Sequence, residues 1–185
     1  MGGGEQGMIA QVLDACVRDQ NISAFYPPGS TQQIASRIAS SGVLNKLASD
    51  WRLPKEVAFD IVKLALFDVI LLIDDSGSMR FDEGGSRIED AKLVVNRIAY
   101  VASLFDHDGI EVRFLNSNEQ GNGLTNEQQA SQLLSRVQWS GLTPLGTSLE
   151  SKVLRPLVLG PAQAGRMKKP ALIITVTDGY VCAPG

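Results

Sequence analysis

The stretch Val69–Ser78 constrains the fold of this chain more than any other part of its sequence. Five apolar residues in succession, Val69 to Ile73, are typical of a strand buried on both faces, as in a parallel sheet covered by helices. The strand runs directly into carboxylates and hydroxyls. Because open α/β sheets bind their ligands at the carboxyl ends of the strands, we expect a functional site at this end of the strand.

The spacing Asp74-x-Ser76-x-Ser78 places one carboxylate and two hydroxyls on a short turn, where Gly77 lets the backbone bend without a Cβ penalty. Oxygen ligands suit hard cations, and a site with few carboxylates fits Mg²⁺ better than Ca²⁺. We therefore expect Mg²⁺, with Mn²⁺ and Ca²⁺ as alternatives. The competing interpretation is a serine-rich turn that caps the next helix, because short motifs produce false positives.

Two later segments also carry a hydroxyl or a carboxylate that could join this site. Gly141–Thr147 contains a loop threonine, Thr143, which the following Pro144 holds extended. Ala171–Gly179 is a second buried-type strand, and it ends in Asp178 followed by a glycine. In this order the three segments resemble the von Willebrand factor A family and its metal-ion-dependent adhesion site, whose pattern is Asp-x-Ser-x-Ser, a loop threonine, and a strand-end aspartate followed by glycine.

The resemblance implies a metal site and a function. Ser76 and Ser78 would be direct ligands, and Asp74, Thr143 and Asp178 direct or water-mediated ones. The site would capture an exposed Asp or Glu of a partner protein, as an adhesion-type module and not as an enzyme.

Three details of this site leave alternatives open. Leu142 stands where many members of the family have glycine. Thr147 is an alternative ligand, although Thr147-x-x-Glu150 is typical of a capping box at the start of a helix. Asp74 could also belong to a Mg²⁺-dependent hydrolase or phosphotransferase, but the chain has no phosphate-binding loop motif and no nucleophile elbow.

The periodicity of the chain predicts its organisation. A flexible start, 1–7, precedes a helical segment, 8–66, which offers a further alternative in which these helices bind the partner and the metal is structural. From 67 to 185, strands alternate with helices, and we expect a doubly wound, mostly parallel sheet with helices on both faces. We expect a strand at 110–114, where apolar and polar residues alternate, and a loop at 116–123.

The last strand, 171–177, should lie at an edge of the sheet. Further strands follow it in the resembling family, but here only 179–185 follow, so we expect that the C-terminal part of the family fold is absent. An apolar edge strand is a template for pairing. We expect it to be covered by a second copy of the chain, by the N-terminal helices, or by a missing part of a longer protein.

Composition narrows the partners and the compartment. A net charge of −3 and a pI near 5.2, without a basic run, give no reason to expect nucleic acid or an anionic membrane as partner. The cysteines, Cys16 and Cys182, lack metal-ligand spacing, and we expect no disulfide framework. The sequence shows no secretion signal and no apolar run near the ~20 residues that span a bilayer. We therefore place the protein inside the cell, in the cytoplasm.

Overall fold

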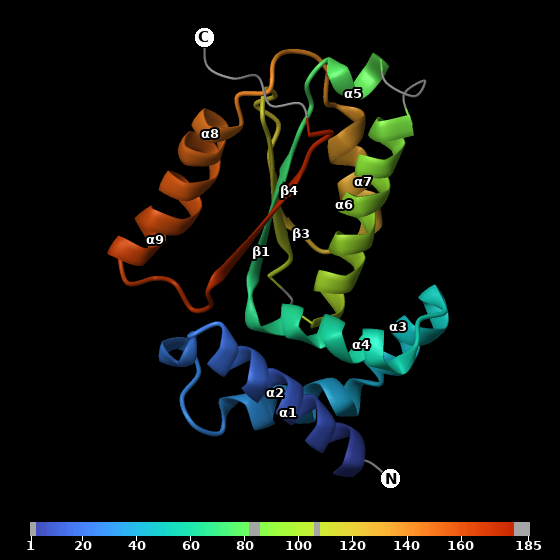
Figure 1. The fold of residues 1–185 in the computed structure, drawn as a ribbon, viewed down its shortest axis with the longest axis vertical. Helices are drawn as coiled ribbons and strands as arrows, with labels where there is room; N and C mark the ends of the chain where they lie inside the picture. The colour runs from blue at the N-terminus through green and yellow to red at the C-terminus, as the bar shows by residue number, and fades with distance from the viewer. Residues whose placement is uncertain (1–2, 82–85, 106–107, 180–185) are drawn as a thin grey trace. The chain divides into compact units, whose positions relative to one another are not determined.

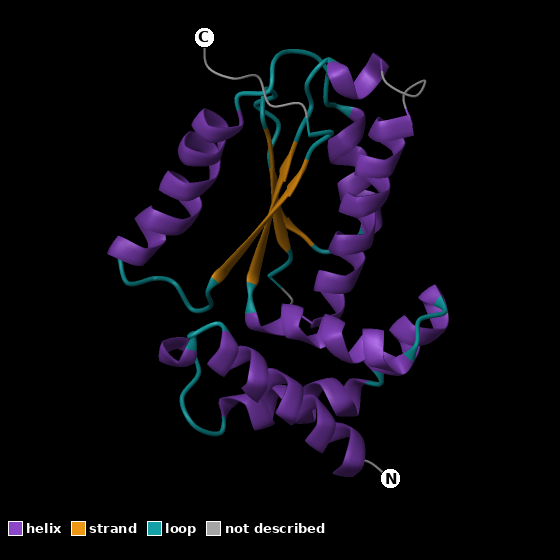
Figure 2. Ribbon diagram, viewed as in Figure 1, coloured by secondary structure: helices purple, strands orange, loops and turns teal. Residues whose placement is uncertain are grey.

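A computed structural model of the chain describes residues 3–81, 86–105 and 108–179, and these form two compact units (Figure 2). Unit 1 comprises Met1–Asp68 with Lys168–Pro170, and unit 2 comprises Val69–Met167 with Ala171–Gly185. The architecture is α/β with one four-stranded mixed sheet. None of the described helices is both long enough and apolar enough to span a membrane.

Unit 1 is helical. Its elements are α1 (Gly3–Asp19), η1 (Ser23–Phe25), α2 (Ser30–Ser41), α3 (Val43–Trp51), α4 (Lys55–Ile61) and η2 (Val62–Leu66). The apolar positions at helical spacing turn inward, so that Ile9, Leu13 and Leu47 are fully buried. The Thr31 hydroxyl, on α2, donates to Asp14 Oδ1 on α1 at 2.6 Å. The short helices of this segment therefore stabilise one another by packing.

The first helix begins earlier than its apolar spacing indicates. Of the expected flexible start, 1–7, residues 1 and 2 lie outside the described residues, and α1 begins at Gly3. Glu5 lies in the first turn, where a negative charge interacts favourably with the helix macrodipole. This interaction opposes only part of the low helix propensity of the neighbouring glycines.

Unit 2 contains the sheet, with strands β1 (Asp68–Ile73), β2 (Ile110–Phe114), β3 (Gly121–Leu124) and β4 (Ala171–Val176) in the order β3-β2-β1-β4. β1 pairs with β2 in parallel, and β2 pairs with β3 antiparallel. Asp68 N donates to Pro170 O (3.0 Å), and Asp74 N donates to Val176 O (2.8 Å). The residue numbers of the two partners rise together, so β4 is parallel to β1. The prediction of a buried central strand is confirmed, since Val69–Ile73 are all buried.

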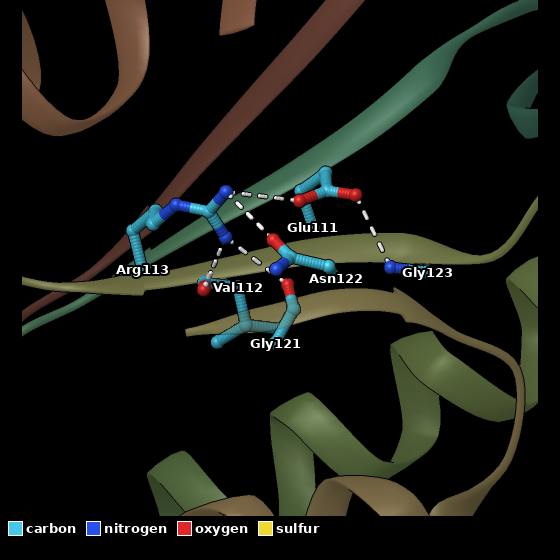
Figure 3. A network of polar contacts seen from close by, with 6 residues as sticks. All are labelled: Glu111, Val112, Arg113, Gly121, Asn122 and Gly123. Carbon is cyan, nitrogen blue, oxygen red and sulfur yellow. Dashed lines mark hydrogen bonds and ion pairs between the residues drawn. The ribbon is translucent and has the colours of Figure 1, made fainter. Parts of the chain in front are cut away.

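The strand β3 was not predicted, because residues 116–123 were expected to form a loop. Its glycines lack the β-branched side chains that mark a strand. Gly121 packs closely there, since a Cβ would lie 2.7 Å from Leu133 Cδ2 and that leucine would have to shift. The buried Arg113 of β2 binds β3 through Gly121 O (3.1 Å) and Asn122 Oδ1 (2.8 Å), and also contacts Glu111 (Figure 3). β2 therefore has a neighbour on each side.

Helices cover both faces of this sheet (Figure 1). One face carries α6 (Ser86–Phe105) and α7 (Glu127–Ser135), and the other carries α8 (Leu145–Ser148), the π-helical η4 (Leu149–Leu159) and α9 (Gly160–Gln163). The short helix α5 (Ser78–Phe81) follows β1. On the η4 side, Val153 packs against Ile70, Leu72 and Leu115 in a buried apolar cluster.

One prediction about the segment after the threonine loop was wrong, namely that Thr147 caps a helix. Helix α8 begins at Leu145 with Pro144 as its N-cap, so Thr147 lies inside the helix and does not cap it. Helical structure continues through Pro156 as η4 and then as α9.

Candidate metal centre

The turn after β1 joins three of the five predicted ligands directly. Asp74 is fully buried, and its Oδ1 accepts the backbone N–H of Ser76 at 2.9 Å. The Ser76 and Ser78 hydroxyl oxygens lie 2.9 Å apart. The buried strand ends here because the polar side chains turn back onto the chain, and α5 begins at Ser78. One carboxylate and two hydroxyls thus form a compact group.

The end of β4 lies beside this group. The Thr177 hydroxyl donates to Asp74 Oδ2 at 2.7 Å, which ties the two neighbouring strand ends together. Asp178 is the next residue, and its side chain is 0% exposed. Its Oδ2 lies 3.1 Å from Nη1 of Arg87, near the start of α6, in an ion pair. The predicted ligand Asp178 therefore already has a cationic neighbour.

The threonine loop is held against the same turn by its backbone. Gly77 N donates to Gly141 O at 3.0 Å, and the Asn116 amide donates to Leu142 O at 2.8 Å. Gly141 has φ +110°, and a Cβ there would lie 2.7 Å from Asn116 Oδ1, so this position requires glycine. Thr143, two residues further on, is buried at 5% exposure. Through these backbone contacts the threonine loop lies against the turn after β1.

Asp75 organises the neighbouring loop and was not predicted as a site residue. It is fully buried, and its two carboxylate oxygens accept the backbone N–H groups of Asn116 (2.8 Å) and Ser117 (2.7 Å). Asn116 Nδ2 also contacts Oδ1 at 3.2 Å. The available signal was a second carboxylate directly after the strand. Through Asn116, Asp75 connects the turn after β1 to the threonine loop.

Whereas Asp75 binds N–H groups of this loop, Lys152 binds carbonyl oxygens at the end of β2 and in the loop. Its ammonium donates to the carbonyl oxygens of Phe114 (2.8 Å), Leu115 (3.1 Å) and Ser117 (2.9 Å). Burial lowers the pKa of Lys152, and the negative charge of Asp75 partly opposes this shift. No sequence signal could have found Lys152 or Arg87, because each reaches its partners from a helix distant in sequence.

The structure thus connects Asp74, Ser76 and Ser78 directly, and brings the segments of Thr143 and Asp178 to the same end of the sheet. The alternative ligand Thr147 is exposed on α8, where its carbonyl accepts a hydrogen bond from Ser151 Oγ (2.7 Å).

The oxygen spacing suits Mg²⁺. Adjacent ligands of an octahedral ion with bonds of about 2.1 Å lie about 3.0 Å apart. The Ser76 and Ser78 hydroxyls form a hydrogen bond of 2.9 Å, a separation that also fits two adjacent ligands of such an ion. A carboxylate accepts about four hydrogen bonds, so Asp74 has capacity beyond its bonds to Ser76 and Thr177. Within 3–81, 86–105 and 108–179, no three His, Cys, Asp or Glu side chains cluster as a metal site. The predicted set relies instead on two carboxylates and three hydroxyls.

Comparison of the chain with models of protein families, with curated proteins and with solved structures finds no match.

Proposed function

We propose that unit 2 is a metal-dependent protein-binding module of the von Willebrand factor A type. In this proposal Mg²⁺, or alternatively Mn²⁺ or Ca²⁺, is held by oxygen atoms of Asp74, Ser76, Ser78, Thr143 and Asp178, and an Asp or Glu of a partner protein completes the site. The observation that carries the proposal is the pair of serine hydroxyls 2.9 Å apart beside the buried carboxylate of Asp74.

The strand order supports the same proposal. β4 lies directly beside β1, as the resemblance requires, so the chain places Asp178 at the strand end next to Asp74. The backbone bond from Gly77 to Gly141 holds the threonine loop near the turn. Three segments that are distant in sequence are therefore fixed by hydrogen bonds at one end of one sheet.

The ligand set accounts for the expected partner. Three of its five members are neutral hydroxyls, and one of its two carboxylates, Asp178, is paired with Arg87. When bound, a divalent cation in such a set supplies a Lewis-acidic position that attracts a further carboxylate. The protein side chains position that cation, and the segments 74–78 and 141–147 contain no histidine or cysteine to act as base or nucleophile. We therefore favour capture over hydrolysis.

Selection of peptides tests this function. The protein is immobilised in Mg²⁺ and exposed to a displayed library of random peptides, and bound peptides are eluted with EDTA. We expect EDTA to release peptides enriched in Asp or Glu, and the Ser76→Ala/Ser78→Ala variant to retain few of them. Peptides that stay bound in EDTA would contradict the proposal and favour binding through unit 1. Turnover of p-nitrophenyl phosphate that requires Mg²⁺ and both serines would favour the enzyme.

A further inference from the structure

We propose that Arg87 and the divalent cation compete for the carboxylate of Asp178, with which Arg87 forms an ion pair. This inference rests on the proposed function, and it adds a regulating residue that the metal motif does not contain. Cation binding and release of the Arg87 guanidinium from Asp178 would be one coupled event.

The burial of Asp178 makes a positive neighbour necessary. Its side chain is 0% exposed, and a buried carboxylate is costly unless a cation or hydrogen bonds compensate its charge. Arg87 Nη1, 3.1 Å from Oδ2, supplies that compensation, and a guanidinium stays charged at every relevant pH. The ion pair therefore compensates the negative charge of Asp178, as a bound cation would.

The two cations cannot share the carboxylate without a penalty. A divalent ion at or near Asp178 would lie within a few ångströms of a guanidinium that is 3.1 Å from the same oxygen. Repulsion at such distances is strong in a partly desolvated site. The Arg87 guanidinium can move away from Asp178, because 25% of its side chain is exposed and its long aliphatic stem can place the charged end in water. The geometry thus favours exchange over coexistence.

The alternative role for Arg87 is to orient Asp178 for the cation. The two roles predict opposite signs for the same substitution. Removing a competitor tightens cation binding, whereas removing an orienting partner weakens it. Arg80 offers a matched control, because it is an exposed arginine two residues after Ser78 and its loss changes the charge near the turn by the same amount.

Calorimetric titration with Mg²⁺ decides between the two signs. We expect Arg87→Gln to lower the Kd for Mg²⁺ about tenfold, equivalent to about 1.4 kcal/mol, and Arg80→Gln to change it less than about twofold. An unchanged or higher Kd in Arg87→Gln, with wild-type secondary structure by circular dichroism, would overturn the competition. If no form of the protein binds Mg²⁺, both the proposed function and this inference fail.

A second measurement on the wild-type protein covers the case in which the variant fails to fold. The Arg87 Nε–Hε resonance in ¹H–¹⁵N NMR spectra should move as Mg²⁺ is added, with the same midpoint as the calorimetric titration. Mg²⁺ that binds while this resonance stays in place would refute the release of Arg87 and leave the proposed function standing.

Discussion

Asp75→Asn tests whether the loops of the site are held by a buried carboxylate. The substitution preserves shape but replaces one oxygen acceptor by an NH₂ donor. In the native protein the two oxygens of Asp75 accept the backbone N–H groups of Asn116 at 2.8 Å and Ser117 at 2.7 Å. An amide can accept only one of these, and its NH₂ group would face the other donor. One of these part-buried N–H groups therefore loses its acceptor.

The expected loss of stability follows from these contacts. A hydrogen bond to a charged group contributes about 1.5–3 kcal/mol, and an unsatisfied buried donor costs about 1–3 kcal/mol. These terms overlap, because both describe the same lost acceptor. The negative charge near Lys152 is lost as well. We expect Asp75→Asn to lower the free energy of unfolding of unit 2 by about 3 kcal/mol.

Urea denaturation followed by fluorescence measures this loss in unit 2 alone. The chain has two tryptophans, Trp51 in unit 1 and the buried Trp139 in unit 2, so a Trp51→Phe background leaves only Trp139 to report. Asp90→Asn, at an exposed position of α6, is the matched control and should stay within about 0.5 kcal/mol of the parent. An Asp75→Asn protein as stable as this control would refute the reasoning.

Three further predictions concern Lys152, Arg113 and β4. Burial lowers the folded-state pKa of Lys152 below its usual 10.5, so between these two pKa values the unfolded chain binds more protons than the folded chain. The stability of wild type relative to Lys152→Met should therefore rise as the pH approaches 10.5. A stability difference that does not change with pH in urea titrations would contradict this. Arg113→Met removes the side-chain bonds to Gly121 O and Asn122 Oδ1, and we expect the amides of β3 to exchange at least about tenfold faster in hydrogen-exchange NMR, while those of β1 are unaffected. β4 is the edge strand of the described sheet, and we expect it to pair with a second copy of the chain. Light scattering should then give a mass that rises with protein concentration, and the β4 amides should exchange slowly in the assembled form. A monomer at every concentration whose β4 amides exchange fast would rule out self-pairing.

The parts of the fold that rest on local pattern were predictable. Five consecutive apolar residues indicated β1, alternation indicated β2, and both strands occur at the predicted residues. The strand β3 has no such pattern. Its backbone pairing depends on Gly121 fitting against Leu133 and on Arg113 binding its carbonyl, and both are contacts between elements. Tertiary contacts determine this strand, so its own composition did not indicate it.

The candidate site was likewise predictable only where its residues lie close together in the sequence. Asp74, Ser76 and Ser78 lie close in sequence, so their proximity could be predicted from spacing. The positions of Asn116 and Lys152 could not, because the loop after β2 is fixed by an aspartate 41 residues earlier and by an ammonium that reaches Leu115 O across 37 residues. Arg87 likewise meets Asp178 only after the sheet has brought β4 beside β1.

Calorimetric titration of Mg²⁺ into the wild-type protein and into Ser76→Ala/Ser78→Ala tests the central claim most directly. The account predicts one site per chain in the wild type and a loss of at least about tenfold in affinity when both hydroxyl ligands are removed, equivalent to about 1.4 kcal/mol or more. Equal Mg²⁺ affinity in the two proteins would contradict the assignment of a metal centre to the turn after β1.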